Sequence, residues 1–64
     1  MENTKLYEIG EVVTWEPSPT VKCVGLVFDD LGKETVNVLC VDINGRKAKT
    51  KIDVQRSLMK RYDV

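Results

Sequence analysis

The stretch that decides the fold reads Thr35-Val36-Asn37-Val38-Leu39-Cys40-Val41-Asp42-Ile43-Asn44-Gly45-Arg46-Lys47-Ala48-Lys49-Thr50-Lys51-Ile52. Its two ends, residues 35–41 and 47–52, are β-type runs of alternating or β-branched residues. The dipeptide Asn44-Gly45 between them suits a type I′ turn, in which both central residues need a positive φ. Two further β-type runs come earlier, at residues 10–15 and 23–28. The four runs and the turn predict a small antiparallel β protein.

The segments around these runs have the chemistry of connections. Pro17 and Pro19 cannot donate a ladder hydrogen bond, so we expect the first strand to end before them. Gly32 suits a turn between the second and third strands. Residues 53–58 are too few for a stable helix, but they suit one helical or 3₁₀ turn capped by Asp53. Residues 59–62 then form a short fifth strand.

Length and hydropathy limit the class of protein. A chain of 64 residues makes one domain, residues 1–64, and buries only about 60% of its unfolded surface. Its stability should therefore be marginal, which favours partners or self-association. No stretch reaches the roughly 18 apolar residues of a membrane span, and the N-terminus lacks a signal-peptide pattern. We expect a cytoplasmic protein that does not bind a membrane.

Two cysteines, Cys23 and Cys40, fall in neighbouring strand candidates. A disulfide between them is geometrically conceivable. In a reducing cytoplasm, two buried thiols that pack as small hydrophobic groups are the favoured state.

Charge is unevenly distributed although the chain carries no formal net charge at pH 7. Residues 1–44 hold three lysines against eight acidic residues, a net charge of −5, whereas residues 45–64 hold seven basic residues against two acidic ones, a net charge of +5. The C-terminal part can therefore present a cationic surface.

Four features, in this order, resemble the SH3-like small barrels. They are the entry Gly10-Glu11-Val12-Val13-Thr14-Trp15, the tripeptide Gly25-Leu26-Val27, the pair Val36 and Val38, and the turn Asn44-Gly45. The closest resemblance is to KOW and Tudor-type barrels and to short stand-alone bacteriophage proteins of this shape. It implies an all-β, five-stranded antiparallel SH3-like barrel with one 3₁₀ turn before the last strand. The chain departs from the KOW pattern at Pro17-Ser18-Pro19, where that family has a glycine-rich basic turn, and its aromatic residues do not gather into a Tudor-type cage.

Strand alternation separates two faces of this barrel. One set of residues should line the interior: Val13, Trp15, Cys23, Gly25, Val27, Val36, Val38, Cys40, Ala48, Thr50 and Ile52. The opposite set contains Leu26, Phe28, Leu39 and Val41, which form an apolar patch. In one interpretation, Leu6, Ile9, Leu58 or Met59 covers this patch as part of a core that extends to both faces. Alternatively, it is a contact surface for a protein partner or a second copy of the chain.

A second candidate site is a row of basic residues. Lys47, Lys49 and Lys51 alternate along one strand and should share a face, with Arg46 and Arg56 extending the row. Such a row can follow a nucleic-acid backbone through phosphate contacts. It can equally be a solvent-exposed edge that prevents aggregation. No aromatic residue is interleaved with the lysines in the sequence, which argues against base stacking.

Catalytic chemistry has little support in this composition. The chain has no histidine, so Cys-His or Ser-His catalysis and a four-ligand zinc site within one chain are excluded. The adjacent Asp29 and Asp30 suit a turn, and no glycine-rich phosphate loop is present. We therefore predict a non-enzymatic binding module without catalytic, metal or cofactor residues. Protein contacts are favoured, and nonspecific nucleic-acid binding is the alternative.

Overall fold

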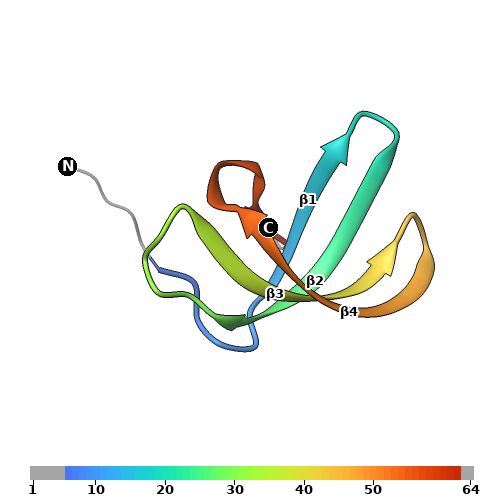
Figure 1. Ribbon diagram of the computed structural model, residues 1–64. Helices are drawn as coiled ribbons and strands as arrows, with labels where there is room; N and C mark the ends of the chain where they lie inside the picture. Colours follow the sequence, from blue (N-terminus) through green and yellow to red (C-terminus); the bar gives the residue numbers. More distant parts are fainter. Residues whose placement is uncertain (1–5, 63–64) are drawn as a thin grey trace.

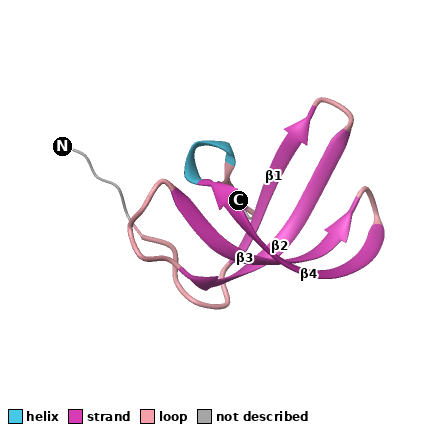
Figure 2. Cartoon of the chain, in the orientation of Figure 1, coloured by secondary structure: helices cyan, strands magenta, loops and turns pink. Residues whose placement is uncertain are grey.

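The computed structural model describes residues 6–62 as five strands and one 3₁₀ turn (Figures 1 and 2). The elements in chain order are β1 (Val12–Ser18), β2 (Val21–Asp29), β3 (Thr35–Ile43), β4 (Arg46–Gln55), the 3₁₀ turn η1 (Arg56–Leu58) and β5 (Lys60–Arg61). The predicted all-β fold with a 3₁₀ turn before the last strand is therefore confirmed. Within this part of the chain, no helix is long and apolar enough to cross a membrane.

The strands form one antiparallel sheet in the order β4-β3-β2-β1-β5. This order is compatible with an SH3-like fold. The sheet is strongly bent (Figure 1), and the β1–β2 and β3–β4 hairpins stay joined near their tips, where Cys23 pairs with Ile43. Among residues 6–62, however, β4 and β5 are not paired with each other. The sheet therefore keeps two edges, and the closed barrel expected from the sequence is not formed by strand pairing.

The Asn44-Gly45 turn has the predicted geometry. Asn44 has φ 53° and Gly45 has φ 86°, the positive values that a type I′ turn requires. The Asn44 side chain also joins this turn to the start of β2, because it accepts a hydrogen bond from the Lys22 amide at 2.8 Å and donates one to the Thr20 carbonyl at 3.2 Å. One residue thus sets the register of the hairpin and attaches its tip to the neighbouring hairpin.

The core lies on one face of the bent sheet. Its buried hydrophobic residues are Val13, Trp15, Cys23, Val27, Val36, Val38, Cys40, Val54 and Met59. Seven of these were predicted to face inward, as was Gly25, which is also buried. Ala48 and Ile52 are half-buried, but Thr50 is exposed. Thr50 does lie on the core side, opposite Cys40, as predicted, but its side chain stays exposed because among residues 6–62 no strand pairs with the second edge of β4.

Several strand ends differ from the sequence-based expectation, and the C-terminal ends of β4 and β1 change what those segments do. β4 continues to Gln55, so Asp53 lies within the strand, and η1 begins without a side-chain cap. This longer strand brings Val54 into the core. β1 continues through Pro17 to Ser18, and its pairing with β2 shifts between Trp15 and Ser18. Proline is tolerated at such an irregularity because no regular ladder bond is lost there.

Candidate interaction face

The predicted apolar patch lies on the face of the sheet opposite the core. Directly opposite residues in an antiparallel pair place their side chains on the same face, and the register aligns Leu26 with Leu39. Leu26, Leu39 and Val41 are half-buried, whereas Phe28 is 38% exposed. We call this surface the outer face.

The four residues expected to cover the patch lie elsewhere or are themselves exposed. Met59 belongs to the core cluster, and Leu58 lines a groove on the core side of the sheet. Leu6 and Ile9 are 50% and 77% exposed, so they can bury little of any surface beside them. The outer face therefore remains partly open to solvent.

The lysines of β4 belong to the same outer face. Lys51 lies opposite Leu39, which in turn lies opposite Leu26, and Lys47 lies opposite Asp42. The Lys51 Nζ is 5.3 Å from the centroid of the Phe28 ring, which is a cation–π distance. The structure thus joins the two predicted sites, the apolar patch and the lysine row, into one continuous surface.

This contact also corrects one prediction. The sequence places no aromatic residue among the lysines of residues 46–51, yet Phe28 of β2 lies beside Lys51 of β4. The signal is invisible in the local sequence because it depends on the register of two strand pairs. An aromatic ring is therefore part of the basic surface after all.

Arg46 does not extend the lysine row on this face. It lies opposite Ile43, and Ile43 lies opposite Cys23, whose side chain is in the core. Arg46, the first residue of β4, therefore lies on the core side of the sheet, whereas Lys47 lies on the outer face.

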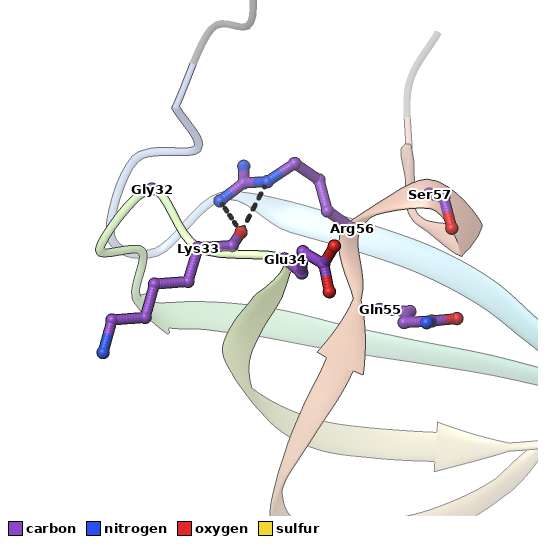
Figure 3. A pocket seen from close by; sticks show the side chains of 6 residues that line it. All are labelled: Gly32, Lys33, Glu34, Gln55, Arg56 and Ser57. Atoms are coloured by element: carbon purple, nitrogen blue, oxygen red, sulfur yellow. Dashed lines mark hydrogen bonds between the residues drawn. The ribbon is translucent and has the colours of Figure 1, made fainter.

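Arg56 is likewise not a free cation. Its guanidinium donates to both carboxylate oxygens of Asp30, at 2.9 and 2.5 Å, and to the Lys33 carbonyl from Nε and Nη2, at 3.0 and 2.8 Å. Figure 3 shows the arginine reaching across to the Lys33 backbone. With four donated hydrogen bonds within the protein, Arg56 has little capacity left for phosphate, and its place in a nucleic-acid row stays a prediction.

The environment of Asp30 explains this pairing. Hydrogen bonds from Arg56 hold the pKa of the Asp30 carboxyl well below its usual value, against the opposing effect of burial, and the amides of Tyr7 and Gly32 add to the lowering. The same hydrogen bond raises the pKa of Arg56. The bond from Gly32 is the turn chemistry predicted for this aspartate, whereas the ion pair was not anticipated.

A hollow of about 440 Å³, lined mainly by residues with polar side chains, lies beside this ion pair. Its lining, drawn in Figure 3, consists of Gly32, Lys33, Glu34, Gln55, Arg56 and Ser57. The guanidinium in its wall is already engaged by Asp30 and Lys33.

A second concavity, which the sequence did not predict, lies on the core side of the sheet. This groove has a volume of about 300 Å³ and runs between β4, the β1–β2 hairpin and η1. Its lining is mainly apolar: Trp15, Pro17, Cys23, Cys40, Ile43, Thr50, Ile52, Asp53, Val54, Gln55 and Leu58. Of this lining, only Trp15, Cys23, Cys40, Thr50 and Ile52 were predicted from the sequence to face inward, and they were expected to line the interior of a closed barrel.

Both cysteines line this groove as free thiols. This confirms the expectation of two buried thiols rather than a disulfide. Burial raises the pKa of Cys23, and the neighbouring Cys40 raises it further, so the thiol is the favoured form. No cluster of three or more metal-ligating side chains occurs among residues 6–62.

No protein-family model, curated protein or solved structure matches the chain. Its class therefore rests on the fold and surfaces described above. The chain forms a small all-β domain with a five-stranded antiparallel sheet, an amphipathic outer face and an apolar groove on the core side.

Proposed function

We propose that this protein is a non-enzymatic binding module that contacts a protein partner through its outer face. The observation that carries the proposal is the position of Lys51 over Phe28, because it makes the apolar patch and the lysine row one surface. An exposed apolar patch with a polar border is typical of protein interaction sites.

The composition of the outer face indicates the chemistry of the partner. Leu26, Leu39 and Phe28 supply apolar area, and Lys49 and Lys51 supply positive charge along one border. A complementary partner has an apolar centre flanked by carboxylates, because opposite charges at the rim speed association and disfavour wrong partners. A second copy of this chain is a less suitable partner when both copies present the same lysines.

The finer family assignment is part of the same proposal. The open five-stranded sheet is compatible with an SH3-like barrel, and the resemblance to KOW and Tudor-type barrels and to stand-alone bacteriophage proteins rests on the sequence pattern alone. In this setting the module acts in the cytoplasm, or in the host cytoplasm if a phage encodes it.

Nucleic-acid binding remains a second candidate because of one specific contact. Phe28 is exposed beside Lys51, and single-strand binding surfaces combine aromatic rings with cations. Phe28→Leu separates the two functions. Loss of a stacked base weakens single-strand binding by about 1–3 kcal/mol, whereas leucine keeps an apolar contact with a protein.

The proposed protein contact can be tested with two charge insertions. Phe28→Asp and Leu39→Asp should remain folded and lose partner capture or self-association, because an unpaired charge is costly to desolvate. Leu31→Asp is the matched control, since Leu31 is an exposed leucine (65%) in the β2–β3 loop. Affinity capture from cell extract and light scattering over a concentration series provide the measurements, and circular dichroism checks folding.

Two outcomes would contradict the protein-binding proposal. If Phe28→Asp and Leu39→Asp both unfold while Leu31→Asp does not, the patch belongs to the hydrophobic core. If both remain folded and behave like the wild type and the control, the outer face makes no contact.

A further inference from the structure

β4 forms one edge of the sheet. β4 is ten residues long, and among residues 6–62 it pairs only with β3. Alternate backbone N–H and C=O groups along this edge therefore have no strand partner. Such an edge is a template for an added strand, which binds through main-chain hydrogen bonds.

The apolar groove lies directly along this edge. Thr50, Ile52 and Val54 of β4 form one wall, and Trp15 and Leu58 lie in the lining contributed by β1 and η1. The volume of about 300 Å³ is at the small end for ligand pockets, which suits a few side chains better than a whole cofactor. A strand added to β4 would direct every second side chain into this groove.

The other side chains of such a strand would meet the lysines. Lys47, Lys49 and Lys51 are exposed and point away from the groove by strand alternation. Charges of opposite sign that face each other on neighbouring strands stabilise the strand pair. Acidic side chains are therefore favoured at the outward positions of the incoming strand, except opposite Asp53.

We infer that the edge of β4 binds an extended peptide segment in which apolar and acidic side chains alternate. The segment adds a sixth strand, its apolar side chains fill the groove beside Trp15, and its carboxylates lie opposite Lys47, Lys49 and Lys51. This site uses the core-side groove, so the inference does not rest on the outer apolar face.

Charge argues against a second copy of the chain as the occupant. In an antiparallel β4–β4 pair centred on Thr50, Lys47 would lie opposite Asp53, but Lys49 would lie opposite Lys51, and like charges directly opposite are destabilising. An acidic partner strand has no such penalty.

The test uses an acetylated and amidated seven-residue probe that alternates valine and glutamate. Trp15 is the only tryptophan and lines the groove, so its fluorescence should change on titration. The peptide should also slow the reaction of Cys23 and Cys40 with a thiol reagent, because both thiols line the same groove.

Three control peptides address strand addition and charge separately. Two of them carry N-methyl groups, one on its valine residues and the other on its glutamate residues. Each set of methyl groups blocks one hydrogen-bonding edge of the peptide. At least one of the two peptides should therefore bind more than tenfold more weakly than the unmethylated probe. A peptide that alternates valine and lysine should also bind more than tenfold more weakly. The double variant Lys49→Glu with Lys51→Glu should reverse this preference, whereas the exposed loop variant Lys33→Glu should not.

Phe28→Asn keeps the groove and the β4 edge and adds no charge beside Lys51, so it should bind the probe normally even if it loses a partner on the outer face. Equal binding of both N-methylated peptides, equal binding of the lysine peptide, or no fluorescence and thiol response up to millimolar peptide would overturn the inference. A dimer in light scattering that the valine–glutamate peptide dissociates would assign the edge to a second copy and would also overturn it.

Discussion

Arg56 donates two hydrogen bonds to the carboxylate of Asp30, although 26 positions separate them in the chain. The Asp30 side chain is only 1% exposed and that of Arg56 is 19% exposed. The same carboxylate accepts the Tyr7 amide at 2.8 Å. One ion pair thus joins the N-terminal segment, the β2–β3 loop and η1, three parts that no strand pairing connects.

Removal of the arginine should therefore be costly. Breaking a fully buried pair costs about 3–5 kcal/mol, and because Arg56 retains some exposure we expect Arg56→Met to lower the free energy of unfolding by about 2–3 kcal/mol. Arg61→Met is the control, since the Arg61–Glu11 pair is 46% and 24% exposed and a surface pair contributes about 0–1 kcal/mol. Urea denaturation measures the loss of stability in both variants. Equal losses would show that the Arg56–Asp30 pair contributes no more to stability than a surface ion pair.

The lowered pKa of Asp30 predicts an acid-sensitive fold. Its folded-state pKa lies below its unfolded value, which is about 3.9 for aspartate. The stabilisation is therefore fully present above about pH 4 and is lost as the pH falls further toward the folded pKa. Asp30→Asn should be less stable at pH 7, and the wild-type advantage over it should shrink between about pH 4 and pH 2. Thermal melts across this range measure the effect, and a constant difference would contradict it.

The sequence predicts those parts of the structure that depend on local chemistry. Asn44-Gly45 determines a turn by its own φ preference, and alternation in residues 35–41 correctly predicts Val36, Val38 and Cys40 in the core. Both signals lie within a few residues, so no knowledge of distant partners is needed.

Other features depend on which distant segments meet. The sequence predicts that Arg56 is a free cation, because no residue near it in the chain indicates that its guanidinium will bind Asp30. Phe28 and Lys51 meet only through the registers of β2, β3 and β4. The groove depends on the absence of a β4–β5 pairing among the described residues, and strand patterns do not encode closure.

Gly25 is required by close packing rather than by its backbone angles. A Cβ at this position would lie 2.6 Å from Val38 Cγ1, 2.7 Å from the Leu39 carbonyl oxygen and 3.0 Å from the Trp15 ring. The Leu39 oxygen belongs to the paired strand β3 and cannot move freely. Gly25→Ala should therefore lower the free energy of unfolding by about 1–3 kcal/mol, the usual cost of overpacking.

Gly45→Ala provides the comparison for Gly25. It has open space around the new methyl group but a φ of 86°, so the cost should be only about 1–2 kcal/mol of backbone strain. Trp15 fluorescence during denaturation distinguishes the two variants. Only Gly25→Ala should change the native emission, because only its methyl group contacts the indole ring. An unchanged native spectrum for Gly25→Ala would show that the indole does not pack against this position.

The lysine row predicts a defined salt dependence if the outer face binds nucleic acid. Each phosphate contact contributes about 0.7 to the slope of log affinity against log salt for a single strand and about 0.9 for a duplex. Replacement of Lys47, Lys49 and Lys51 together by glutamine should therefore reduce the slope by about two to three units, equally for unrelated sequences.

Lys22→Gln with Lys33→Gln is the control, because these exposed lysines lie outside β4. The melting temperature should barely change, since exposed charges contribute little to stability. If the wild type is not retained on either form of nucleic acid at about 50 mM salt, where such binding is strong, the row does not bind phosphate and its role is limited to protein contacts and protection of the β4 edge.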